Sequence, residues 1–163
     1  MKRLDREDGR KIPYQASVAE MEKFYDRQFD LIKKGNTDLV TLELVMLGKA
    51  LDFIHMIKKR LGTELDLTER SVGALEEVVD ACVRGVMQDN LFTDEYSIAK
   101  SMSAYLGVLI ISTIGGGWED TETGMSVNVN GRSANVDDYI ERRLLGLSDL
   151  KVQTFYSSVK LVK

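Results

Sequence analysis

Three residues in the second half of the chain, Tyr105, Trp118 and Asn128, are of types that could line a binding cleft. Trp118 is the only tryptophan, and it follows the run Gly115-Gly116-Gly117, which removes side-chain bulk beside the indole. A large aromatic residue at the first position of a strand can also seal a helix layer against a hairpin, so we expect Trp118 to be a structural anchor. The alternative is that Trp118 and Tyr105 are walls of a cleft.

The residue types that most often carry catalysis are few, or they stand outside the known motifs. His55 is the only histidine, which excludes a histidine-based metal site and a second imidazole for proton transfer. We interpret it as a partly exposed structural residue. None of the serines stands in the Gly-x-Ser-x-Gly pattern of a nucleophile elbow, because Gly124-Met125-Ser126 lacks the closing glycine. The sequence therefore predicts no catalytic triad.

Two short segments could bind ions, but each lacks the order of residues that such a site needs. The Gly115–Gly117 run offers backbone amides, yet phosphate loops generally precede a helix and this run follows one. Glu119, Asp120 and Glu122 lack the alternating ligands and the closing glutamate of a calcium loop. A helix stop and a solvated turn are favoured, and we predict no catalytic residue, no metal and no cofactor.

Length and composition predict one domain over residues 1–163, with residues 1–13 as a frayed N-terminus. A chain of 163 residues with 44% hydrophobic residues can bury a sizeable core. The net charge is -4 and the sequence pI is about 5.1, which disfavours a nucleic-acid partner.

The sequence also predicts a cytoplasmic protein. The first ten residues lack the apolar middle region of a secretion signal, and Cys82 is the only cysteine, interpreted as a small buried hydrophobe. The charge-free run from Ser101 to Trp118 has roughly the length that suggests a membrane helix. Serines, a threonine and three glycines interrupt it, so we expect a buried core helix and no membrane insertion.

Helical periodicity dominates the first two thirds of the chain. Ser17 and Glu20 form a capping box for a helix over about 17 to 34, with apolar positions at Met21, Phe24, Tyr25, Leu31 and Ile32. Thr37 or Asp38 could cap a second helix that ends at Gly62. Asp66 and Thr68 start a third helix through about Gln88, and the connection 90–94 leads into a fourth that ends near Ile114.

The period then changes to strict alternation at Met125, Val127 and Val129, which predicts a β-hairpin over about 117 to 130. These three side chains are expected on the buried face, with Ser126, Asn128 and Asn130 on the wet face. Asn135 with Asp138 begins a further helix, and a last helix follows Ser148-Asp149. The predicted class is α+β, mainly helical, with about six helices and one β-hairpin.

The segment Tyr105-Leu106-Gly107, the glycine run, Trp118 and the two-stranded segment with its later glycine and short helix together resemble a bacterial family of domains of unknown function, numbered 3806. The resemblance covers roughly the second half of the chain. It implies a helix that leads into a hairpin and a bacterial origin. Because the family is functionally uncharacterised, it implies no catalytic residue.

Two hypotheses about function follow. The favoured one is a non-enzymatic module that binds a protein partner, because an acidic surface without catalytic motifs fits a binder. The alternative is a small enzyme of unknown reaction with Tyr105, Trp118 and Asn128 in a cleft. A broad apolar patch on the surface would favour the first hypothesis, and a deep polar pocket would favour the second.

Overall fold

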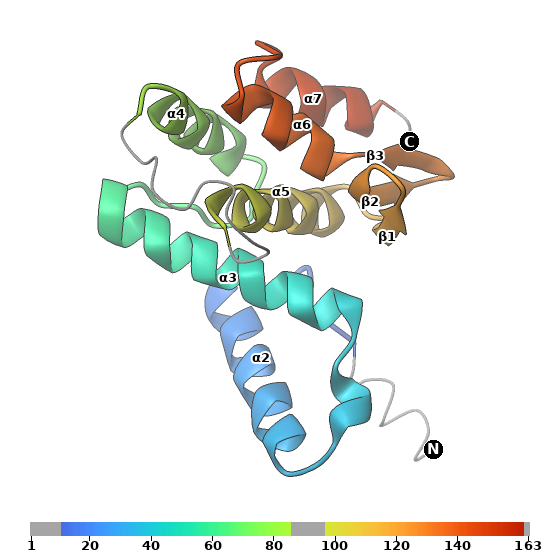
Figure 1. Cartoon of the computed structure of the whole chain (residues 1–163). Coiled ribbons are helices and arrows are strands. Elements are labelled where there is room, and N and C mark those ends of the chain that lie inside the picture. The colour runs from blue at the N-terminus through green and yellow to red at the C-terminus, as the bar shows by residue number, and fades with distance from the viewer. Residues whose placement is uncertain (1–10, 86–96, 162–163) are drawn as a thin grey trace.

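The computed structural model describes residues 11–85 and 97–161, and it confirms the predicted α+β class. These residues form six α-helices, one 3-10 turn and a three-stranded antiparallel sheet (Figure 1). The elements are α2 (Val18–Lys33), η1 (Thr37–Leu39), α3 (Leu42–Leu61), α4 (Ser71–Val83), α5 (Ile98–Thr113), β1 (Gly117–Thr121), β2 (Gly124–Val129), β3 (Arg132–Ala134), α6 (Val136–Leu144) and α7 (Val152–Lys160).

The first helix begins where the sequence predicts. The side chain of Ser17 accepts the backbone N–H of Glu20 at 3.2 Å, and the Glu20 carboxylate accepts the backbone N–H of Ser17. These two bonds satisfy N–H groups that the first turn of a helix leaves without partners. The capping box is therefore confirmed.

The second helix begins later than predicted, because a short element precedes it. Residues Thr37–Leu39 form a 3-10 turn, Val40 is extended, and α3 begins at Leu42. The cap is Thr41, whose hydroxyl accepts the N–H of Leu44 at 3.2 Å. Gly62 ends α3 with a φ of 73°, as predicted.

The third helix is shorter than predicted. Asp66 accepts hydrogen bonds from the backbone and hydroxyl of Thr68, which makes a local turn, and α4 begins only at Ser71. The predicted end at Gln88 and the connection 90–94 lie outside the described residues.

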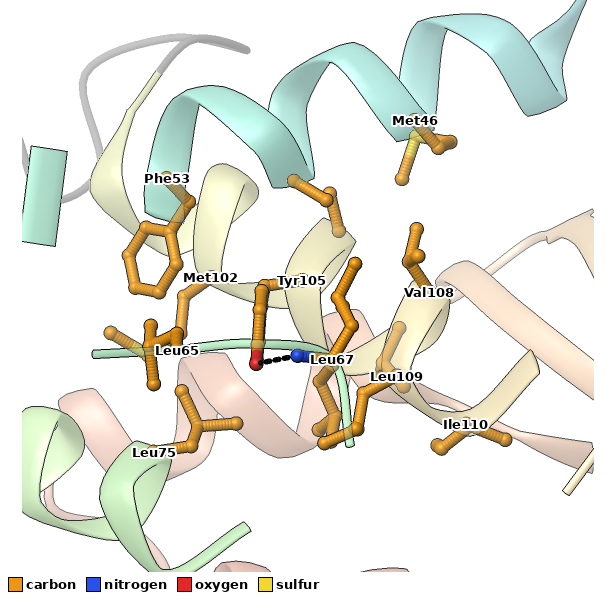
Figure 2. Packing of buried hydrophobic residues seen from close by; sticks show 14 of the residues in the cluster. Met46, Phe53, Leu65, Leu67, Leu75, Met102, Tyr105, Val108, Leu109 and Ile110 are labelled. Carbon is orange, nitrogen blue, oxygen red and sulfur yellow. Dashed lines mark hydrogen bonds between the residues drawn. The ribbon is translucent and has the colours of Figure 1, made fainter. Parts of the chain in front are cut away.

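Helix α5 is the centre of the molecule. Figure 1 shows it between α3 on one side and α6 with α7 on the other, and α3 is its main packing partner. Of its 16 residues, 13 are buried, so the expected core helix is confirmed. Figure 2 shows how Phe53 of α3, Leu75 of α4 and Met102 and Leu109 of α5 meet in this core. Within the described residues, no helix is long and apolar enough to cross a membrane.

The predicted hairpin is present and has one more strand. Strands β1 and β2 pair with Trp118 opposite Val127, and β2 pairs with β3 with Val127 opposite Ala134. The tight turn between β2 and β3 is Asn130-Gly131, with φ values of 52° and 86°. Such a pair of positive φ angles fits the two-residue turns that match the twist of a hairpin.

The predicted faces of β2 are correct for the valines and wrong for one serine. Val127 and Val129 are buried, and Met125 is half-buried. Ser126 was expected on the wet face but is only 1% exposed, and its hydroxyl has no hydrogen-bond partner among the described residues. This part of β2 is therefore covered on both faces, whereas Asn130, at the turn, is exposed.

A buried ion pair ties α4, α6 and the start of α7 together. Arg143 donates to both oxygens of the Glu76 carboxylate, at 3.0 and 2.8 Å, and to the backbone carbonyl of Leu150 at 2.8 Å. Glu76 also accepts the backbone N–H of Val152 at 2.7 Å. Because each charge is surrounded by hydrogen-bonding groups, the pair holds three helices in register at a tolerable desolvation cost.

Helix α2 crosses α3 and projects away from the rest of the molecule (Figure 1), and we name these two helices, with the residues between them, the arm. Met21, Phe24 and Gln28 are the buried residues of α2. The other 13 residues of α2 are half-buried or exposed.

Candidate functional site

Tyr105, the first of the three residues expected at a cleft, lies wholly inside the core. Its hydroxyl accepts the backbone N–H of Leu67 at 2.9 Å and is 2.9 Å from the hydroxyl of Ser71, as Figure 2 shows for the Leu67 bond. Burial raises the pKa of the Tyr105 phenol to about 12, against the opposing effect of the hydrogen bonds from Ser71 and Leu67. The Tyr105 hydroxyl therefore holds the segment that leads into α4. Within this segment, Leu67 has a φ of 61°.

Trp118 is 8% exposed and rests on Gly107 of α5. A Cβ atom at position 107 would lie 2.0 Å from Cη2 of the indole, so only glycine leaves room for the ring. The indole N–H has no acceptor among the described residues. This packing agrees with the expectation of an anchor between the sheet and the central helix.

Asn128 lies on the other face of the sheet from Trp118, because it stands opposite Gly117 in the strand register. Its amide donates to the carboxylate of Glu119 at 3.4 Å, and its carbonyl accepts the N–H of Gly131 at 2.9 Å. Glu119 also accepts the hydroxyl of Ser133. The predicted solvated acidic turn is thus partly tied to the sheet through Glu119.

These positions give Tyr105, Trp118 and Asn128 three separate surroundings. Along α5, Tyr105 and Gly107 are two positions apart, which places the phenol and the indole on nearly opposite sides of the helix. None of the three residues lines any of the four main surface hollows found on the described residues. A binding role for them stays a prediction from the sequence.

One hollow lies along the arm, and we name it the arm groove. It has a volume of about 370 Å³ and is lined by Tyr25, Val45, Gly48, Lys49, Asp52, Phe53, Met56 and Ser101. Most of its lining residues are on α3, with Tyr25 contributed by α2 and Ser101 by α5. The volume is within the range of small binding pockets.

Close approach of α2 and α3 forms the groove. A Cβ atom at Gly48 would lie 2.6 Å from the hydroxyl oxygen of Tyr25, so the glycine is what lets the tyrosine rest on α3. At the N-terminal end of α2, Glu22 pairs with His55 of α3. His55 is 67% exposed in its side chain, which agrees with its interpretation as a structural residue.

Two polar groups of the arm groove, Asp52 and Tyr25, have raised pKa values. Burial raises the pKa of the Asp52 carboxyl, and the charge of His55 opposes this effect. Burial, then the charges of Asp52 and Asp26, raises the pKa of Tyr25.

Two exposed apolar side chains, Phe29 and Val45, lie at the arm groove or contact a residue that lines it. Phe29 is 47% exposed and its ring stacks on Tyr25, with centroids 6.3 Å apart, while Val45 is 41% exposed and lines the groove. Five of the ten large apolar side chains exposed in the described chain are on the arm: Phe29, Leu31, Val40, Leu42 and Val45. Of these five, Phe29 and Val45 are the two that the groove and its ring contacts bring into one region.

Periodicity alone does not find this site. The sequence places Tyr25 and Leu31 in the buried stripe of the first helix, but Tyr25 is half-buried and Leu31 is exposed. The sequence does contain one signal of this site. With Phe29 included, the first helix has more apolar residues than a single buried face can hold.

The other hollows have weaker claims. The widest, about 720 Å³, is open and lies between segment 11–16 and the end of α5, so it reaches the first described residue. Another, of about 240 Å³, contains Asp137, which accepts the N–H of Met125 at 2.9 Å and pairs with Lys100 at 3.3 Å. That carboxylate fastens β2 to α5 and α6, which is a structural task.

Comparison with known proteins gives no further guide: no protein-family model, curated protein or solved structure matches the chain.

Proposed function

We propose that this chain is a non-enzymatic module that binds a protein partner along its α2–α3 arm. The observation that carries the proposal is the apolar surface made by Tyr25, Phe29 and Val45 beside the arm groove. An apolar surface of this kind gains free energy when a partner removes it from water. Aromatic residues at the centre of such a surface usually contribute most of the binding energy.

The charges beside this surface define the chemistry of the partner. Glu22 precedes the aromatic pair on α2, Asp26 lies between its two members, and Lys33 follows it, with its ammonium 5.2 Å from the centre of the Phe29 ring. A complementary partner presents an apolar or aromatic side chain between a basic group and an acidic group. The basic group faces Glu22 and the acidic group faces Lys33.

Capture from an extract of the native host tests this function. The immobilised chain is compared with Phe29→Asp and Val45→Asp, which place a charge on the exposed apolar surface. Leu147→Asp is the matched control, because Leu147 is an exposed leucine on the connection between α6 and α7. Each variant is first checked by circular dichroism for an unchanged melting temperature.

The expected result is a protein partner that the wild-type chain and Leu147→Asp both retain and that the two arm variants lose. With the purified partner, Phe29→Asp should weaken binding roughly 30-fold, which is the effect of losing one central residue of an interface. Equal retention of the same proteins by all four chains would contradict an interaction site on the arm.

A further inference from the structure

One exposed face of α2 carries its side chains in a definite chemical order. Glu22, Tyr25, Asp26, Phe29 and Lys33 follow one another at spacings of three or four residues apart from the neighbouring pair Tyr25-Asp26, so they share one face of the helix. We name this set the α2 stripe. Its order is an acid at the N-terminal end, two stacked aromatic rings in the middle with Asp26 between them in the sequence, and a base at the C-terminal end.

The α2 stripe is complementary to the same stripe of a second copy that runs in the opposite direction. When a second α2 lies antiparallel to the first, Glu22 of each copy comes level with Lys33 of the other. The same register brings the aromatic pair of one copy against the aromatic pair of the other. The two ends of the stripe are about 16 Å apart at the rise of an α-helix, so both ion pairs and the central contact fit along a single helix pair. A parallel arrangement would place like charges together.

Three side chains of the stripe already contact neighbours within the arm. Glu22 pairs with His55, Phe29 stacks on Tyr25, and Lys33 lies over the Phe29 ring. Side chains that are ordered before association lose less conformational entropy when a partner binds. Figure 1 shows that α2 projects from the molecule, so a second helix can approach it without meeting α4, α6 or α7.

We propose that the partner bound by the arm is a second copy of this chain, packed antiparallel along the α2 stripe in a two-fold symmetric dimer. This inference rests on the proposed function and names its partner. A two-fold axis requires a surface that is complementary to itself, which the order acid, aromatic, aromatic, base provides. Phe29 of each copy then lies beside Tyr25 and Val45 of the other, at the mouth of the arm groove.

Charge exchange between the two ends of the stripe gives a sharp test by sedimentation velocity at low salt. In a dimer of Glu22→Lys chains, two lysines face two lysines, and in a dimer of Lys33→Glu chains, two glutamates face two glutamates. A mixture of the two variants forms two attractive pairs in each mixed dimer. We expect each variant alone to self-associate about tenfold more weakly than wild type, and the mixture to recover.

Three further chains complete the test. The double variant Glu22→Lys/Lys33→Glu restores both pairs within a homodimer and should self-associate again. Phe29→Asp removes the central contact and should be monomeric. Lys58→Glu is the control, because Lys58 is an exposed lysine of α3 that pairs with Glu64 and lies outside the stripe.

Two results would overturn the inference. One is a wild-type chain that stays monomeric at hundreds of micromolar. The other is a dimer whose strength does not follow the charge exchange. If the chain is monomeric but Phe29→Asp still loses a different captured protein, this inference fails and the proposed function stands. If the chain is monomeric and Phe29→Asp changes no capture, both fail.

Discussion

The sheet docks on α5 where the Trp118 ring rests on Gly107. A single added methyl group at position 107 would block this contact. A Cβ atom at position 107 would lie 2.0 to 2.7 Å from three atoms of the indole ring. Since both groups are buried, the indole cannot move away without disturbing the strand that carries it. Helix propensity alone would favour alanine at this position by up to about 1 kcal/mol, so the packing term must outweigh it.

Gly107→Ala should therefore lower the free energy of unfolding by about 1 to 3 kcal/mol, which is the usual cost of overpacking a core. Gly73→Ala is the matched control: Gly73 is an exposed glycine in α4, and a Cβ atom there meets nothing within 4 Å. That variant should be neutral or slightly stabilising. Urea denaturation measures both changes. Equal effects at the two positions would contradict the close contact between α5 and the indole.

Tyr105 has a structural task that its residue type does not reveal. Tyr105→Phe removes the acceptor for the N–H of Leu67 and should cost about 1 to 3 kcal/mol, because a buried donor is left without a partner. Tyr156→Phe is the comparison, since the Tyr156 hydroxyl donates to the side chain of Thr113 and leaves no backbone group unpaired. Its cost should be nearer 1 kcal/mol. A thermal melt of each variant distinguishes the two cases, and a larger loss for Tyr156→Phe would refute the reasoning.

Strand β2 shows what alternation in the sequence can and cannot predict. Alternation correctly places Val127 and Val129 in the core, because a slip by one residue would exchange the two faces. It cannot predict the burial of Ser126, which depends on how other parts of the chain cover the second face. The third strand could have been predicted, since Asn130-Gly131 is the strongest short hairpin signal.

The two faces of β2 respond differently to charge. Val127→Asp should be severely destabilising, because Val127 is fully buried and a new carboxylate there would have no partner. Asn128→Asp should be milder, because Asn128 is only half-buried. It does place a second carboxylate beside Glu119, so a smaller loss from like-charge repulsion is expected. Similar melting temperatures for the two variants would show that the strand faces are wrongly assigned.

Helix boundaries were predicted well where a side chain caps the helix and poorly where several candidate caps occur close together. Ser17 and Asn135 cap the helices that the sequence assigned to them. Thr37 and Asp38 compete with Thr41, and Thr41 is the one whose hydroxyl meets a backbone N–H at the start of α3. The arm groove could not be predicted because it depends on how α2 and α3 cross at Gly48, which is a tertiary contact.

For the molecule as a whole, the pair between Glu76 and Arg143 links stability to pH. Burial raises the pKa of the Glu76 carboxyl, but the hydrogen bonds from Arg143 and from the Val152 N–H, with the charge of Arg143, outweigh burial and leave the pKa below its usual value. A carboxyl whose pKa is lower in the folded state than in the unfolded state stabilises the fold above the unfolded pKa. That contribution is lost as the pH falls through the folded pKa.

We therefore expect the melting temperature to fall between about pH 5 and pH 3, where carboxyls in unfolded chains begin to bind protons. Glu76→Gln should lower stability at neutral pH and flatten this dependence. Glu77→Gln is the control, because Glu77 is the exposed neighbour on the same helix. Melting curves measured across this range check the prediction. An unchanged slope in Glu76→Gln would mean that other carboxyls govern unfolding in acid.

The enclosure of α5 also matters while the chain is being made. Helix α5 is complete at Thr113, and the sheet and α6, which cover one side of it, are encoded by residues that follow. At common rates of translation, the roughly 30 residues from Thr113 to the end of α6 need about 2 to 6 seconds. During that interval the most apolar helix of the described chain has no cover on one side, so the nascent chain passes through a stage at which chaperones can bind it and premature release would lead to aggregation.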